Sequence, residues 1–183
     1  SNNVSREAFV SDYKFKDNYL YLSFKHWYVG AVTTSFEIKK INISNGVLAW
    51  DHTSQTTILN MSTIGTPNSS DGTNEAILSF DFGCNNDIYA TGYYASDNWQ
   101  PAAWGIMRIN DTNGTKINDN TIFNSHDQIV DFYSVGLGAY VIDGQVIFVG
   151  NLEYSQGYNV RTVVKTDTTL NSITSVQAPC SVL

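Results

Sequence analysis

The sequence is poor in basic residues and has no long hydrophobic run. Ten Lys and Arg stand against 17 Asp and Glu, which gives a formal net charge of -7. A surface with this excess of negative charge repels a phosphate backbone and an anionic bilayer, so we expect no nucleic-acid partner. No run of 18 apolar residues occurs and no basic segment precedes an apolar stretch at the start, so we expect no membrane insertion and no signal peptide in this sequence.

Cysteine and histidine are also scarce. Cys84 and Cys180 are too few and too far apart for a zinc cluster, so they form one disulfide or remain two free thiols. The three histidines, His26, His52 and His126, stand in no metal-binding spacing and beside no nucleophile motif. The sequence therefore indicates no catalytic residue and no metal ligand.

Aromatic and turn-forming residues are abundant instead. Tyr (11), Phe (9) and Trp (4) favour strands, and 13 Gly with many Asn and Thr supply turns. A hydrophobic share of 42% is enough for a real core, so we expect a folded β protein.

Glycosylation sequons suggest a secreted location. The pattern Asn-x-Ser/Thr begins at Asn3, Asn42, Asn60, Asn68, Asn110 and Asn113. We take Asn42, Asn60, Asn68, Asn110 and Asn113 as candidate glycosylation sites of an extracellular or cell-surface protein. The alternative is that these residues simply form Asn-rich turns that happen to precede Ser or Thr.

An internal repeat organises the chain. Shifting the sequence by 68 residues without a gap superimposes 8–54 on 76–122, with identities that include Tyr21/Tyr89, Ile38/Ile106 and the Asn-Gly pairs at 45–46 and 113–114. A third copy follows at a shorter offset, where VIFVG (146–150) matches IYATG (88–92). Each copy alternates with period two, which predicts short antiparallel strands; in copy two they are 76–82, 87–94, 104–110 and 115–123.

Two segments of copy two resemble a known repeat family. NDIYATGYYASDNW (86–99) and WGIMRINDTNG (104–114) are similar to the β-propeller repeat family with units of the type GNVYVTGYT and FVAKLDxxG. FEIKKINISNGVLAW (36–50) resembles the second half of that unit. Copy one has Phe24 where the family has Gly, and copy three has Leu170 and Asn171 in place of Asn-Gly. The resemblance implies architecture and no particular activity.

The repeat and the resemblance together predict an all-β fold of three four-stranded antiparallel blades, a partial β-propeller. Blade 1 spans about 8–54, a loop covers 55–75, blade 2 spans about 76–123 and blade 3 about 129–178 of a single segment. Three blades cannot close a ring, since closed propellers have about four to eight. We therefore expect partners, either further blades of the same protein or neighbouring subunits.

The connection between the second and third strands is aromatic in every copy. Trp27, Tyr28, Tyr94, Trp99, Tyr154 and Tyr158 are our candidate ligand-binding residues, for a glycan or a protein. The alternative is that these rings pack between blades. Calcium at 111–114 or 69–75 is a further hypothesis, because acidic loops with Gly can bind a hard cation; both loops lack the full ligand series, and we expect no other cofactor.

Two functions follow from these features. The first is a non-catalytic extracellular or cell-surface module that binds protein or glycan or builds an assembly. The second is part of a propeller-type hydrolase or lyase whose catalytic residues lie partly outside this chain. Carboxylates clustered at the centre of the ring favour the enzyme, and an exposed aromatic face favours the binding module.

Overall fold

The chain folds into strands and turns in a computed structural model that describes residues 6–28, 34–53, 74–95, 103–122, 134–155, 158–171 and 173–177. These residues form twelve strands and no helix, which confirms the all-β prediction. The strands are β1 (Arg6–Lys16), β2 (Tyr19–Tyr28), β3 (Thr34–Asn42), β4 (Leu48–Thr53), β5 (Asn74–Phe82), β6 (Asp87–Ala95), β7 (Ala103–Asn110), β8 (Lys116–Ile122), β9 (Val135–Ile142), β10 (Gln145–Ser155), β11 (Tyr158–Thr166) and β12 (Ile173–Gln177).

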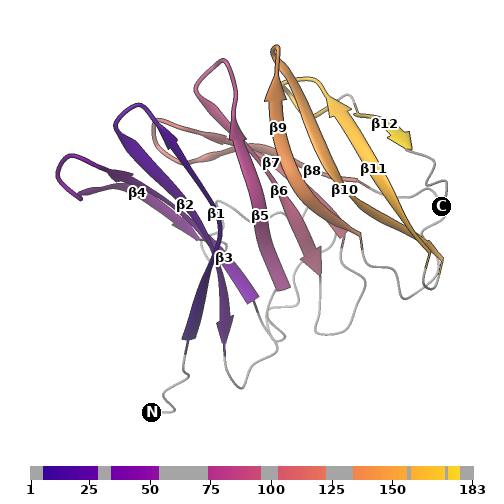
Figure 1. Cartoon of the computed structure of the whole chain (residues 1–183), viewed down its shortest axis with the longest axis horizontal. Helices are drawn as coiled ribbons and strands as arrows, with labels where there is room; N and C mark the ends of the chain where they lie inside the picture. Colours follow the sequence, from indigo (N-terminus) through magenta and orange to yellow (C-terminus); the bar gives the residue numbers. More distant parts are fainter. Residues whose placement is uncertain are drawn as a thin grey trace, which may run out of the picture.

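Three antiparallel four-stranded sheets are stacked side by side. Blade 1 is β1–β4, blade 2 is β5–β8 and blade 3 is β9–β12, and within each the strands pair in chain order. One parallel residue pair, Thr34 with Asn74, joins blade 1 to blade 2. The sheets splay like the leaves of a fan, with β1, β5 and β9 following one another (Figure 1). This arrangement is that of consecutive blades in an incomplete propeller.

Residues that favour turns separate the strands. The strands predicted in copy two agree with β5–β8 to within two residues. Gly46 and Gly114 both have φ of +69°, which glycine adopts without steric cost, and Asp143 and Gly144 form the first turn of blade 3 with φ of 49° and 75°. In the Asn-Gly pairs the glycine takes the left-handed conformation, while the side chain of Asn113 caps the turn by accepting a 3.0 Å hydrogen bond from the Thr115 N–H.

The strand register confirms that the three copies are structurally equivalent. Tyr21 pairs with Lys40, Tyr89 with Arg108, and Ile147 with Lys165. These three pairs stand at the offsets of 68, 58 and 57 residues that the sequence indicates. The fourth strand continues each row with Trp50, Asn118 and Thr174 respectively. A position in one blade can therefore be assigned to its counterpart in another.

The hydrophobic core lies between the blades and consists of two clusters. One joins blades 1 and 2, and its buried members are Tyr21, Phe36, Ile38, Trp50, Ile77, Phe80, Ile88, Ala90, Met107 and Ile109. The other joins blades 2 and 3, and its buried members are Tyr89, Trp104, Ile106, Ile122, Ala139, Val146, Phe148, Leu152, Val164 and Leu170. Successive residues of a strand point to opposite faces, so blade 2 contributes Ile88 to one cluster and Tyr89 to the other. Blade 2 is thus covered on both faces.

Glycines in blade 3 make room for an aromatic ring of blade 2. The Trp104 side chain is fully buried, and its indole lies against the backbone of Gly136 and Gly150. A Cβ atom added at Gly150 would meet both this indole and the carbonyl oxygen of Val135. The close approach of blades 2 and 3 therefore requires glycine at this position.

We predict that Gly150→Ala lowers the free energy of unfolding by about 1–3 kcal/mol, because the backbone of Val135 cannot move aside for the added methyl group. Gly138→Ala is the control, since the atoms nearest to its added methyl belong to the exposed ring of Tyr140, which can move aside. Denaturant unfolding of the two variants measures the difference. Equal stability of both variants would show that the blades tolerate a wider spacing here.

Candidate functional site

The predicted aromatic site lies at one end of the blades. Tyr28 ends β2, Tyr94 lies near the end of β6, and Tyr154 and Tyr158 flank the β10–β11 connection. Their backbones therefore stand at the same end of the three second-to-third strand hairpins, as does that of Trp27 in β2. Their side chains lie outside the described part of the structure, and so does Trp99 as a whole. Ligand binding at this end stays a prediction.

The opposite end of the blades carries the described sequons. Asn42, Asn110 and Asn113 stand in the turns after β3 and β7. Asn42 accepts a 2.9 Å hydrogen bond from the Ser44 N–H, and Asn110 accepts one of 2.8 Å from the Thr112 N–H. These asparagines therefore build turns whether or not they carry sugar.

The Asn113 side chain is exposed, while that of Asn110 is half-buried. Asn3, Asn60 and Asn68 lie outside the described residues. Cys84 is exposed in the β5–β6 turn, but Cys180 is not described, so their pairing stays a prediction. The side chains of His26, His52 and His126 also lie outside the described part.

A buried carboxylate, Asp111, is the centre of the densest polar cluster in the described structure. Only 6% of the residue is exposed. One carboxylate oxygen accepts hydrogen bonds from the Tyr21 hydroxyl (2.5 Å) and the Lys40 ammonium (2.8 Å), and the other accepts one from Lys16 (3.0 Å). Its carbonyl oxygen accepts a 2.9 Å bond from the Trp50 indole N–H. Blade 1 thus supplies every one of these donors to a single turn residue of blade 2.

The electrostatics of this cluster are set by burial and by the lysines. Burial alone would raise the pKa of the Asp111 carboxyl, but hydrogen bonds from Lys40, Tyr21 and Lys16 outweigh it, so its pKa lies below the usual value. Burial, followed by the bond to Asp111, raises the pKa of the Tyr21 hydroxyl. Asp111 is therefore ionised and Tyr21 neutral around pH 7. In these states Asp111 accepts the hydrogen bond from Tyr21 and forms ion pairs with Lys16 and Lys40, which join blades 1 and 2.

The sequence placed Asp111 only in a turn that could bind calcium. Both of its carboxylate oxygens are instead engaged by donors of blade 1, and two of those donors are cations. A calcium ion would have to displace them against like-charge repulsion. The repeat does show that Lys40 is equivalent to Arg108 and Tyr21 to Tyr89. Only the packing of blade 1 on blade 2 shows that Lys40 and Tyr21 reach the Asp111 carboxylate. The 69–75 loop is described only from Asn74 onward.

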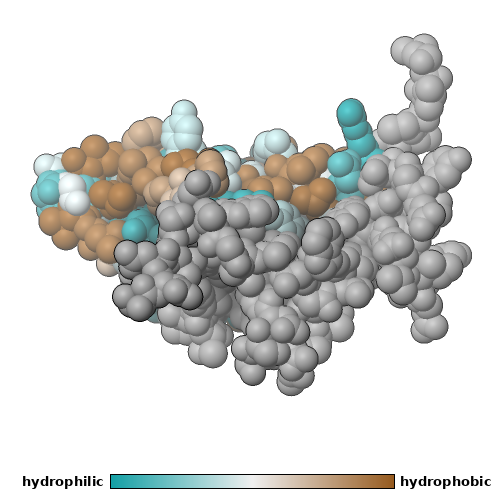
Figure 2. Space-filling view, turned by 90° about the horizontal axis from the view of Figure 1, so that it is seen from below, coloured by the Kyte–Doolittle hydropathy of each residue, from teal (hydrophilic) through white to brown (hydrophobic). Residues whose placement is uncertain are grey.

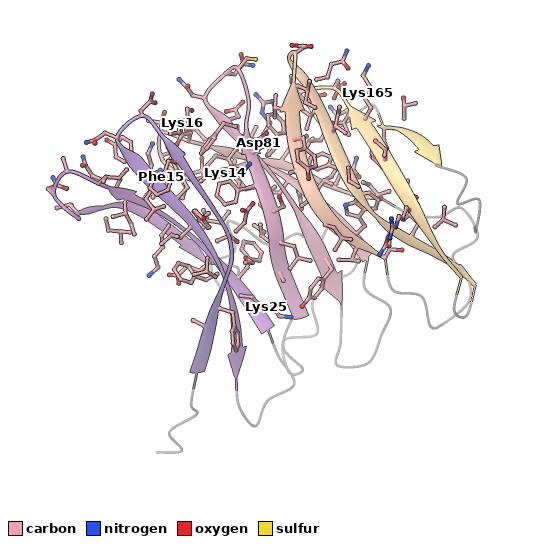
Figure 3. The ribbon with its side chains drawn as sticks, viewed as in Figure 1. Lys14, Phe15, Lys16, Lys25, Asp81 and Lys165 are labelled. Carbon is pink, nitrogen blue, oxygen red and sulfur yellow. The ribbon has the colours of Figure 1, made fainter. Side chains whose placement is uncertain are left out.

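Several other described carboxylates also have structural partners. Asp87 forms a 2.5 Å ion pair with Arg108 within blade 2, and Asp81 pairs with Lys14 of blade 1 at 3.3 Å (Figure 3). Glu37 pairs with Lys39 at 3.2 Å. Among the described residues no group of three or more His, Cys, Asp or Glu side chains could hold a metal ion. These acids fasten strands and blades together.

The two outer faces of the stack expose apolar side chains. Residues paired directly across antiparallel strands share a face. By this rule the outer face of blade 1, here the N-terminal flank, presents Val10, Tyr13, Phe15, Leu20, Leu22, Phe24, Ile41 and Leu48, with the charged pair Glu37 and Lys39. The outer face of blade 3, here the C-terminal flank, presents Tyr140, Ile142, Ile147, Val149 and Val163, with the cations Arg161 and Lys165.

The N-terminal flank is the more exposed of the two. Val10, Tyr13 and Phe15 are 54%, 62% and 64% exposed, and the rings of Tyr13 and Phe15 meet edge to face. Viewed from below, hydrophobic side chains gather at the end of the molecule where blade 1 lies (Figure 2). Counterparts of these residues in blade 2 are buried: Leu20 corresponds to Ile88 and Tyr13 to Phe80.

No protein-family model and no curated protein matches this chain. Within the residues described, no helix is present that is long and apolar enough to cross a bilayer.

We predict that Asp111→Asn lowers the free energy of unfolding at neutral pH by about 2 kcal/mol or more, because Lys16 and Lys40 lose their buried counter-ion. The folded-state pKa of Asp111 lies below its unfolded-state value of about 3.9. Ionised Asp111 therefore stabilises the fold above that pH, and this contribution is lost as pH falls through the lower folded-state pKa.

Urea unfolding at neutral and at acidic pH measures this effect. The stability difference between wild type and Asp111→Asn should shrink as pH falls below about 4. Asp143→Asn is the matched control, since Asp143 is exposed in a turn where Asn tolerates the positive φ. A pH-independent difference for Asp111→Asn would contradict an ionised clamp.

Proposed function

We propose that this chain is a non-catalytic extracellular or cell-surface module of the β-propeller repeat family, which works by binding other protein and building an assembly. The observation that carries the proposal is the pair of apolar flanks. Each flank is one whole face of a sheet, and the face that corresponds to it elsewhere in the chain is buried against a neighbouring blade. Contiguous apolar surface of this kind marks a protein interface.

The burial of such a face is strongly favourable. Apolar surface removed from water contributes about 25 cal/mol per Å². Tyr13, Phe15 and Tyr140 are each roughly half exposed or more. Covering them and their neighbours on the same sheet face therefore gives a drive of several kcal/mol towards association.

The enzyme hypothesis has less support. A hydrolase or lyase requires a carboxylate, or another acid-base group, that is free to act on substrate. The Asp111 carboxylate instead accepts a hydrogen bond from Lys40 across the boundary of blades 1 and 2, and Asp87 accepts one from Arg108 within blade 2. The best-defined acids thus have structural roles.

Glycan or peptide binding at the aromatic end is a second candidate. The observation that favours it is the placement of Tyr28, Tyr94 and Tyr154 at one end of three equivalent strands. Aromatic rings brought together by a repeat offer a stacking surface for sugars. Exchange of these three residues for Ala should abolish such binding without loss of fold.

We predict that Tyr13 is covered by a partner in the natural setting. A Tyr13→Cys variant, made with Cys84→Ser and Cys180→Ser, should react with a maleimide at least about tenfold more slowly in native material than Ile117→Cys in the same background. Ile117 is a suitable control because it is 43% exposed and lies in β8 of blade 2, outside both flanks. Equal labelling rates at the two positions would contradict the proposed function.

We also predict that Asn113 carries a glycan in natively sourced material while its neighbour Asn110 does not. Both amide oxygens accept hydrogen bonds within the turn, but Asn113 is exposed whereas Asn110 is half-buried, so only Asn113 is open to the glycosylating enzyme. Peptide mapping with enzymatic deglycosylation measures occupancy at each sequon. Bare asparagines at every sequon would count against secretion.

A further inference from the structure

We propose that the partner of these flanks is a second copy of the same chain: the C-terminal flank of each copy packs on the N-terminal flank of the other, and two copies close a six-bladed ring. This inference rests on the proposed function and names its partner. Three features of the flanks support it, each read from the strand register. At each of these positions the residues on both flanks differ from those at the internal blade contacts. The change on one flank matches the change on the other.

The two internal interfaces follow one rule. The Tyr21 hydroxyl bonds to Asp111 in the last turn of the next blade, and the Tyr89 hydroxyl bonds to the carbonyl of Thr168 in the equivalent turn. Trp50 and its counterpart Asn118 likewise donate to the main chain of those turns. Each blade thus presents the same face forward to its successor, so the contact is head-to-tail and can be continued by another copy.

The main chain of the next blade's first strand is held in the same way at both interfaces. The Phe80 N–H donates to Asp12 of blade 1 (3.0 Å), and the Ala139 N–H donates to Ser79 of blade 2 (3.3 Å). Asp12 and Ser79 occupy equivalent positions opposite Ser23 and Thr91. The inner edge of each first strand is thus capped by the preceding blade.

The first compatible change concerns charge. The position that holds the aromatic rings of Phe36 and Trp104 in blades 1 and 2 is Arg161 in blade 3. The glycine that receives Trp104, Gly150, corresponds to Phe24 in blade 1, which pairs with Glu37. Phe24 and Glu37 already attract one cation, since the Lys39 ammonium lies 5.9 Å from the Phe24 ring centroid and 3.2 Å from the Glu37 carboxylate. A docked C-terminal flank brings the Arg161 guanidinium to the same ring and carboxylate, where it takes the place of Lys39 through cation–π and ionic attraction.

The second change concerns the strand edge. The acceptor position of Asp12 and Ser79 is Gly138 in blade 3, which has no side chain to offer. The N–H that would need this acceptor, that of Tyr13, already donates to the Asp12 carboxylate of its own chain at 2.8 Å. The acceptor missing from the C-terminal flank is thus supplied within the N-terminal flank.

The third change replaces the polar residues of the Tyr21–Asp111 contact by apolar ones on both flanks. Ile147 occupies the position of Tyr21 and Tyr89 and has no hydroxyl to donate. The turn residue that corresponds to Asp111 is Ile43 in blade 1, since each bonds through its N–H to the carbonyl of the equivalent first turn. Ile43 is 49% exposed. A buried carboxylate without its donor would be costly here, and both flanks avoid it.

Ring closure follows from the number of blades. A head-to-tail contact repeats until the ring closes, and closed propellers hold about four to eight blades. Two copies of three blades supply six. In such a ring each copy uses each flank once, so no strand face remains exposed.

The first experiment measures the mass of the purified 183-residue chain by sedimentation equilibrium and light scattering. We expect twice the 20.3 kDa of one chain. Tyr13→Asp on one flank and Tyr140→Asp on the other should each give monomers, because every interface of the ring contains both residues. Ile117→Asp, an exposed apolar control in β8 of blade 2 and outside both flanks, should remain dimeric.

Mixing the two monomeric variants tests the head-to-tail geometry. Tyr13→Asp chains retain an intact C-terminal flank and Tyr140→Asp chains an intact N-terminal flank, so an equimolar mixture should recover dimers that neither variant forms alone. A face-to-face dimer of two identical flanks would instead be insensitive to one of the two substitutions, and that result would overturn the proposal.

The charge contact is tested by two substitutions of equal charge change on one flank. Arg161→Glu should weaken dimerisation about tenfold or more, since it faces Phe24 and Glu37. Lys165→Glu should change it no more than about threefold, because its expected neighbour is Ile43 and not a carboxylate. Circular dichroism confirms that both variants are folded. Equal effects of the two substitutions would show that Arg161 has no specific partner.

Failure of this inference is distinguishable from failure of the proposed function. A chain that stays monomeric at all concentrations, or that grows into open polymers, overturns the two-copy ring. If Tyr13→Cys is nevertheless protected from maleimide in native material, the flank binds a different protein, and the proposed function stands without the second copy.

Discussion

The structure depends on one constraint, which is that a β-sheet with apolar side chains on both faces must be covered on both. Blade 2 meets this requirement with Ile88 and Met107 on one face and Tyr89 and Ile106 on the other. Blades 1 and 3 carry the same alternation but have only one neighbour each. The internal cores and the exposed flanks are therefore two results of the same sequence pattern.

Polar contacts give this packing its direction. Apolar faces alone would allow the blades to slide or to pair in another order. The donors gathered around Asp111, and the capping of the Phe80 and Ala139 N–H groups, fix each blade in one position against the next. The donors around Asp111 lie on the preceding blade, whereas the N–H groups of Phe80 and Ala139 donate to side chains of the blade before them. Because the two faces of a blade thus make different contacts, the stack has a front and a back. In the proposed ring, the contact between copies has the same polarity.

The charge distribution is consistent with a role in assembly. Of the ten basic residues, Lys14, Lys16 and Lys40 form ion pairs between blades 1 and 2. Arg161 and Lys165 lie on the outer face of blade 3. In a chain with net charge -7, placing scarce cations at blade boundaries reduces repulsion where the sheets approach most closely.

The β class, the three copies, the strand limits of copy two and the turns at 45–46, 113–114 and 143–144 were all predicted from local sequence patterns. These properties are set by alternation and by turn residues, and the 68-residue repeat relates them between copies one and two. The role of Asp111, the glycines that receive Trp104 and the faces that stay open became clear from the packing of the blades. These depend on contacts between residues up to about a hundred positions apart, such as Lys16 with Asp111. A sequence pattern records that a residue faces outward from its strand, but not which blade it meets there.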